Sequence, residues 1–120
     1  MNQTDFLYIL NQLKLFHWNT KSFAAHKAFG KAYELLDDLI DEFVEMWQGE
    51  YGIMNTGFLS DNVLNKNTPD GISRFFNDTQ DFLLITIPQH INSDTDKDLL
   101  NKRDEILGCL SRLKYLLTLS

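Results

Sequence analysis

The sequence is poor in the residues that build disulfides, tight loops and membrane spans. It contains one cysteine, two prolines and six glycines among 120 residues. A single cysteine, Cys109, cannot form an intramolecular disulfide, and the lack of a thiolate cluster argues against a zinc finger or an iron–sulfur centre. Because Cys109 lies in an apolar helical pattern, we expect a buried thiol in a reducing compartment. No apolar run approaches membrane-spanning length and the opening residues lack a basic signal segment, so we expect a cytoplasmic protein.

Positive charge is also scarce. The chain has 11 lysines and arginines against 17 aspartates and glutamates, a formal net charge of −6. Such a chain lacks a broad cationic surface for phosphates or anionic lipid, so neither nucleic acid nor a membrane is an expected partner. Hydrophobic residues make up 43% of the chain and aromatic residues 12%, which is typical of a folded protein. The length predicts a single domain over residues 1–120.

Apolar residues recur at helical spacing in the first half of the chain. The first predicted helix follows Phe6–His17, with Thr4 or Asp5 as its cap, and is broken over Asn19–Ser22. The second spans about Phe23–Gln48, and Gly49 and Gly52 beyond its end supply a stop. Its apolar stripe consists of Phe29, Leu36, Ile40, Phe43 and Trp47. We therefore expect a helical hairpin with a short link.

Two further helices are predicted after a long connection. Residues Gly49–Gly71 are rich in glycine and asparagine and read as a crossover loop, with one short helical turn around Phe58–Leu64. Thr68 and Pro69 open a third, phenylalanine-rich helix that ends near Pro88. Ser93 or Asp94 caps a fourth helix, whose apolar positions are Leu99, Ile106, Leu110, Leu113 and Leu117. The first and third links between these helices are short and the second is long. This order predicts an all-α, ferritin-like four-helix bundle, with a plain up-down bundle as the alternative.

Imidazoles and carboxylates form the one group of residues that points to a chemistry. His17 and His26 lie at similar distances from the first turn and can face one another, and Asp41 and Glu45 lie one helical turn apart. Nitrogen and carboxylate ligands together suit a divalent ion such as Fe(II). His26 and Asp41 are separated by about 22 Å of helix, so one ion cannot touch both within one chain. Two copies with antiparallel second helices would bring the two halves together, which predicts a homodimer or higher homo-oligomer with shared metal sites.

The segment Phe16–Thr20, which reads Phe-His-Trp-Asn-Thr, followed by His26, Tyr33, Asp41 and Glu45, resembles the Dps family of mini-ferritins. The resemblance implies a ferritin-like fold and an inter-subunit iron-oxidation centre. His17 and His26 would be ligands from one subunit, and Asp41 and Glu45 ligands from its partner. Trp18 would lie beside the centre as an electron relay, and the protein would be a ferroxidase that handles iron and peroxide or oxygen.

The chain departs from that family in several places. The interval from His17 to His26 is about three residues shorter, and Gly30 stands where the family commonly adds an acidic ligand, for which Glu34, Asp37 or Asp38 would have to substitute. The short crossover and the missing basic tail argue against a twelve-subunit cage and against DNA compaction. The segments Leu39–Glu45 and Gln48–Gly52 are similar to small ferritin-like proteins of tailed bacteriophages, which implies a viral source and the host cytoplasm.

Each of these residues also has a purely structural interpretation. His17 on an apolar helix face can be a hydrogen-bonded core residue, and Trp18 and Trp47 are more often packing residues than relays. The acidic arc of the second helix, which comprises Glu34, Asp38, Asp41 and Glu45, is typical of a solvated surface. The alternative function is therefore a non-enzymatic acidic helical protein of a phage that binds a basic host partner.

Overall fold

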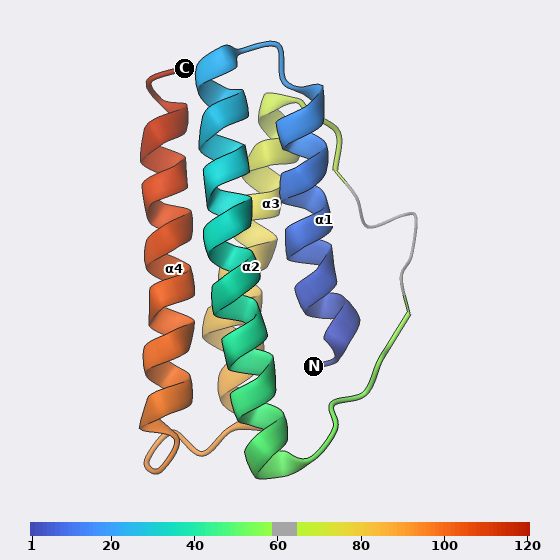
Figure 1. The fold of residues 1–120 in the computed structure, drawn as a ribbon, viewed down its shortest axis with the longest axis vertical. Coiled ribbons are helices and arrows are strands. Elements are labelled where there is room, and N and C mark those ends of the chain that lie inside the picture. The colour runs from blue at the N-terminus through green and yellow to red at the C-terminus, as the bar shows by residue number, and fades with distance from the viewer. Residues whose placement is uncertain (59–64) are drawn as a thin grey trace.

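The computed structural model describes residues 1–58 and 65–120. Helices dominate these residues, and no strand occurs among them (Figure 1). The elements are α1 (Gln3–Asn19), α2 (Phe23–Tyr51), α3 (Pro69–Asp81), a π-helical turn η2 (Phe82–Thr86), a 3-10 turn η3 (Ile87–His90) and α4 (Lys97–Leu117). None of these helices combines the length and the apolar character that crossing a bilayer requires. The all-α prediction and the helical bundle are confirmed.

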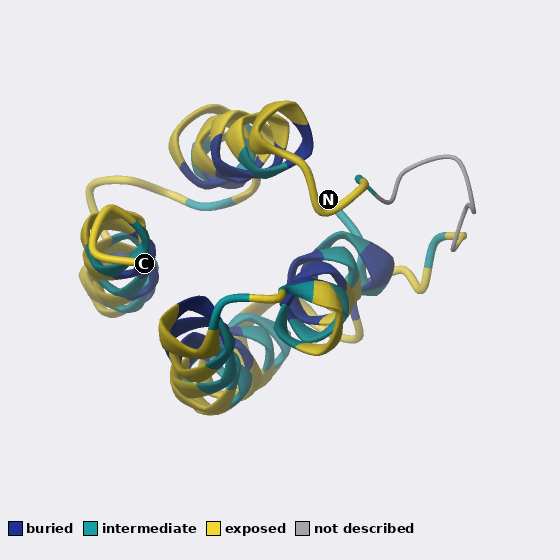
Figure 2. Cartoon of the chain, turned by 90° about the horizontal axis from the view of Figure 1, so that it is seen from above, coloured by how far each residue is buried: buried dark blue, intermediate teal, exposed yellow. Residues whose placement is uncertain are grey.

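The four long helices run side by side along the long axis of the molecule. α1 and α4 point one way and α2 and α3 the other, because α3 starts at the same end of the bundle as α2 (Figure 1). Seen end on, the helices surround a common centre toward which their buried sides face (Figure 2). α2 packs against both α1 and α4. The outer side of α2 is exposed along much of its length.

The sequence patterns predict the start of α2 correctly, but they do not predict the residue that caps α1. Asn2, rather than Thr4 or Asp5, caps α1: its side chain accepts from the backbone N–H of Asp5, whose carboxylate accepts from the N–H of Asn2 in return. α2 begins at Phe23 as predicted, capped by Ser22. It ends three residues later than expected, at Tyr51, because Gly49 continues the helix.

Gly52 caps the C-terminus of α2, and its φ of 93° lies in the left-handed region that glycine adopts without steric cost. In the connection that follows, the predicted helical turn around Phe58–Leu64 lies outside the described residues, apart from Phe58, which is exposed and not helical. Thr68 and Pro69 then open α3 as predicted.

The last helix begins later than the sequence patterns indicate. The cap predicted at Ser93 or Asp94 is wrong, since α4 starts at Lys97 with Asp96 in the capping position. The Asp96 carboxylate does not bond to the first turn of its own helix, because it accepts from the N–H of Asn92 and from the hydroxyl of Tyr51 instead. Tertiary contacts therefore place the start of α4.

Phenylalanine rings fill the centre of the bundle. Phe16 of α1 lies 5.6 Å from Phe75 of α3, edge to face, and Phe6 lies 5.1 Å from Phe82 in η2. The core contains the predicted apolar positions Phe29, Leu36, Ile40, Phe43, Leu99, Ile106, Leu110 and Leu113. Trp47 is half-buried and donates its indole N–H to the carbonyl of His90 at 3.0 Å. The expectation that Trp18 packs in the core is wrong, since 64% of its surface is exposed.

Candidate metal centre

The last turn of α1 and the first turn of α2 bring His17 and His26 together. The two imidazoles stack, with 3.9 Å between ring centroids and 18° between their planes. Nδ1 of His17 lies 2.7 Å from the carbonyl oxygen of His26, and Nδ1 of His26 lies 2.8 Å from the carbonyl oxygen of His17. The link between the helices is short because α1 ends at Asn19 and Ser22 already caps α2. The expectation that the histidines face one another is confirmed.

The reciprocal hydrogen bonds determine how each neutral ring is protonated. A carbonyl oxygen can only accept, so Nδ1 of each imidazole must carry the hydrogen. Nε2 of each ring then keeps its lone pair. A Nδ1–H bonded to a backbone carbonyl, with Nε2 as the ligand, is the arrangement found around metal-binding histidines. Each Nε2 atom can therefore accept a proton or bind a cation.

Gly30 makes room for this histidine pair. A Cβ atom at position 30 would lie 2.8 Å from Cε1 and 2.9 Å from Nδ1 of His17. Such distances are shorter than real Cβ contacts, so any side chain here would push the His17 ring out of its stack. The resemblance to the Dps family implies only that Gly30 stands where an acidic ligand is expected. The structure shows that an acidic side chain and the observed ring position exclude one another.

Aromatic rings and lysines occur in the same turns of α1 and α2 as the histidines. The Phe23 ring, 72% exposed, lies 6.4 Å from the His26 ring in a stacked orientation, with Nζ of Lys27 5.2 Å above Phe23. Nζ of Lys14 lies 5.8 Å from the exposed ring of Trp18 and 4.4 Å from that of Tyr33. The histidines are themselves partly buried. The hairpin end of the bundle therefore presents partly shielded imidazoles beside exposed aromatic rings.

The predicted carboxylate ligands lie elsewhere on the same helix. Asp41 and Glu45 are exposed, and α2 continues without interruption between them and His26. A continuous helix keeps them about 22 Å from the imidazole, as the spacing predicts. Among the substitutes considered for the missing ligand, Glu34 and Asp38 are exposed and Asp37 is half-buried. Across residues 1–58 and 65–120 of one chain, no three His, Cys, Asp or Glu side chains converge on a metal position.

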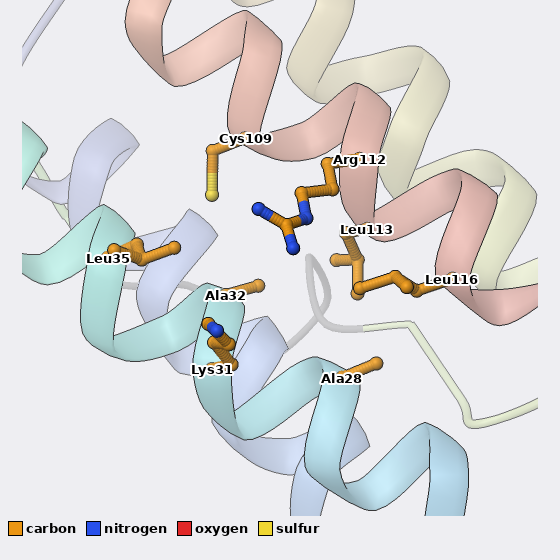
Figure 3. A pocket seen from close by; sticks show the side chains of 8 residues that line it. All are labelled: Ala28, Lys31, Ala32, Leu35, Cys109, Arg112, Leu113 and Leu116. Carbon is orange, nitrogen blue, oxygen red and sulfur yellow. The ribbon is translucent and has the colours of Figure 1, made fainter.

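A small pocket lies between α2 and α4 (Figure 3). Ala28, Ala32 and Leu113 contribute to its walls, and the thiol of Cys109 points toward it from α4. Its volume of about 30 Å³ is enough for about one water molecule. Cys109 is half-buried, and this burial raises the pKa of its thiol above the ordinary value. The pocket is too small for an organic cofactor, and its thiol stays protonated at neutral pH.

A second polar contact, which the sequence patterns did not predict, closes the opposite end of the bundle. The hydroxyl of Tyr51, the last residue of α2, donates to the carboxylate of Asp96 in front of α4. This bond raises the pKa of Tyr51 to about 12 and lowers the pKa of Asp96, which also accepts from the N–H of Asn92 at 2.7 Å. The contact joins residues 45 positions apart and has no local signature in the sequence.

Comparison with known proteins gives a family and a similar phage protein but no activity. The family described as "Family of unknown function (DUF5856)" matches residues 17–117. The "Uncharacterized 14.6 kDa protein in mobD-ri intergenic region" of Enterobacteria phage T4 is 34% identical over 104 residues, which cover 86% of this chain and 74% of the phage protein. No solved structure matches. The expected likeness to phage proteins is confirmed, and the chain belongs to the family of unknown function DUF5856.

Proposed function

We propose that this chain is a ferritin-like protein that binds Fe(II) at a site shared between two copies. His17 and His26 of one copy would supply nitrogen ligands, and Asp41 and Glu45 of the other would supply carboxylates. The observation that carries the proposal is the reciprocal Nδ1-to-carbonyl bonding of the stacked imidazoles, which leaves both Nε2 atoms free to bind a cation.

The course of the chain supports the ferritin-like part of the proposal. α2 and α3 run in the same direction, so the segment between them has to link opposite ends of the bundle, and each belongs to an antiparallel pair with a short link (Figure 1). Ferritin-like bundles have this single long crossover, whereas a plain up-down bundle has only short links. The helix order thus favours the first of the two predicted topologies.

The ligand types suit iron that changes its oxidation state. Imidazole nitrogens hold a divalent ion in position, and two carboxylates stabilise the additional charge of Fe(III) through their own charge. Oxygen or peroxide would accept the electrons. Trp18 follows His17 in the chain and is exposed, and its ring would take part in electron transfer to the bound ion. A two-fold dimer would contain two equivalent sites.

Metal titration of a carboxylate variant tests the proposal. The double variant Asp41→Ala/Glu45→Ala is titrated with Fe(II) without oxygen, and with Zn(II), by calorimetry beside the unchanged protein. We expect its affinity to fall by at least about tenfold to a hundredfold, because half of the ligands are removed. The matched control, Asp78→Ala/Asp81→Ala, removes two exposed carboxylates from α3 and should bind as the unchanged protein does. Undiminished binding by the first variant refutes the site.

A second candidate function follows from the acidic arc of α2. Glu34, Asp38, Asp41 and Glu45 are all exposed in the chain, and the net charge of −6 adds to their field. Such a surface suits a basic protein partner of the host. Partner capture would then weaken as salt is raised and would survive His17→Ala/His26→Ala. If the amount of captured partner does not change with salt concentration, or if capture requires the histidines, this second function is contradicted.

A further inference from the structure

The exposed face of α2 carries its charges in two blocks. Lys27 and Lys31 lie in the half next to the hairpin, and Asp38 and Glu42 lie in the other half. At about 100° per residue, these four side chains share an arc about 60° wide. All four are exposed, and at helical spacing they lie on the side of α2 away from the core residues Phe29 and Leu36. One narrow stripe of the helix is thus basic at one end and acidic at the other.

These charges are arranged symmetrically about one point of the helix. Lys27 and Glu42 lie equally far from the midpoint between Glu34 and Leu35, and so do Lys31 and Asp38. If a second α2 lies antiparallel with its centre at that point, Lys27 is level with the partner's Glu42, and Lys31 is level with the partner's Asp38. The two-fold axis repeats both pairs. A parallel arrangement would instead place like charges beside one another.

The predicted metal ligands give the same alignment independently. In the arrangement centred between Glu34 and Leu35, His26 is level with the point midway between the partner's Asp41 and the partner's Glu45. A two-fold axis normal to the helix pair keeps each residue and its copy on the same side of the contact. The lysine–carboxylate pairs therefore lie along one side of the interface and the histidines along the other, with Asp41 toward the histidine side and Glu45, about five helical turns from Lys27, in line with the lysines. Two sets of residues with different chemistry specify one alignment.

We infer that α2 of a second copy of this chain packs antiparallel on the outer face of α2, in the alignment that these charges define. The inference rests on the dimer of the proposed function and adds its alignment and its dependence on salt. Leu35, 44% exposed next to the centre, contributes an apolar contact. The Glu42 carboxylate lies 2.5 Å from Nζ of Lys102 in its own chain and stays 52% exposed, so it can receive a second cation.

Charge reversal tests this alignment in the absence of metal. Sedimentation velocity with a chelator measures the dimer dissociation constant of three full-length proteins: the unchanged chain, Lys27→Glu/Lys31→Glu, and Asp38→Lys/Glu42→Lys. Each variant alone converts four attractive pairs into four repulsive ones, and we expect its dissociation constant to rise at least about a hundredfold at about 0.02 M salt. An equimolar mixture of the two variants restores all four pairs, so heterodimers should form with nearly the original affinity.

The control and the overturning results separate this inference from the metal site. Arg74→Glu/Lys114→Glu makes the same charge change on exposed residues of α3 and α4 and should leave dimerisation unchanged. Two results overturn the alignment: an unchanged protein that stays monomeric at about 100 µM at low salt, or variants that do not recover on mixing. A dimer that passes these tests but binds neither Fe(II) nor Zn(II) refutes the proposed function and leaves the alignment standing.

Discussion

His17 and His26 hold one another in place, because Nδ1 of each bonds to the carbonyl oxygen of the other at 2.7 and 2.8 Å. The pair joins the end of α1 to the start of α2, its rings stack, and the His17 ring lies over Gly30. The same contacts that close the helical hairpin thus orient both imidazoles. Structure and the proposed chemistry depend on the same two side chains.

Gly30→Ala should destabilise the protein although alanine favours helices. The added Cβ would lie 2.8 Å from the His17 ring, and displacing a packed ring costs about 1–3 kcal/mol, against a gain of about 1 kcal/mol in helix propensity. We expect a net loss of up to about 2 kcal/mol in the free energy of unfolding, measured with urea.

Two other helical glycines provide matched controls. A Cβ at Gly49 or at Gly108 would meet no atom within 4 Å. Gly49→Ala and Gly108→Ala should therefore each stabilise the protein by about 0.5–1 kcal/mol through helix propensity alone. If Gly30→Ala gains as much as Gly108→Ala, the His17 ring is not fixed over position 30.

The bond between Tyr51 and Asp96 should make stability depend on pH at both extremes. The pKa of Tyr51 is raised from 10.0 to about 12, so its contribution is complete below pH 10 and disappears as the pH rises toward about 12. The pKa of Asp96 is lowered from 3.8, so its contribution is present above that value and is lost as the pH falls through the lowered pKa. Thermal unfolding followed by circular dichroism across both ranges measures the two losses.

Removing the hydroxyl distinguishes this pair from general alkaline or acid unfolding. Tyr51→Phe should lower the unfolding temperature at neutral pH and flatten its decline between pH 10 and about 12. Tyr115→Phe removes a hydroxyl from an exposed ring on α4 and should change neither quantity. Equal alkaline declines in Tyr51→Phe and the unchanged protein would show that Tyr51 does not carry the effect.

Gln12 should anchor the segment in front of α3. Its buried side chain donates to the carbonyl of Asn65 at 3.0 Å and accepts from the N–H of Asn65 at 2.6 Å. Gln12→Leu removes both bonds and leaves two backbone groups without their partner, at about 1–3 kcal/mol each where they remain buried. We expect lower stability in urea and faster hydrogen exchange at the Asn65 amide. Exchange at an unchanged rate would mean that the side chain does not hold this segment.

Local patterns predicted the helices well because amphipathic spacing is a property of neighbouring residues. The positions of α2 and α4 along the chain, and buried residues such as Leu36, follow from that spacing. Caps were predicted less well, since several residues that can cap a helix stand together before α1 and α4. Which of them is used depends on distant contacts, as the Tyr51–Asp96 bond shows.

The sequence likewise predicted some features of the candidate site and not others. The meeting of His17 and His26 could be predicted, because both lie near one short turn. The role of Gly30 could not be predicted, because the ring that fills the space beside it is that of His17, which belongs to α1. The exposure of Trp18 was also missed, since an aromatic residue at a helix end carries no local signal of which way it points.

Glu34 lies next to the centre of the inferred dimer and supplies an unfavourable contact. In the alignment that pairs Lys27 with the partner's Glu42, Glu34 comes close to the partner's Glu34 across the two-fold axis, and like charges at that separation repel. Glu34→Gln removes the repulsion and keeps the side-chain size, so we expect the dimer dissociation constant to fall about twofold to tenfold at low salt. Asp81→Asn removes the same charge from an exposed position on α3 and should have no such effect. Sedimentation of both variants over a dilution series measures the two dissociation constants. If Glu34→Gln weakens the dimer, this carboxylate attracts a cation of the partner, and the centre of the interface lies at another point of α2.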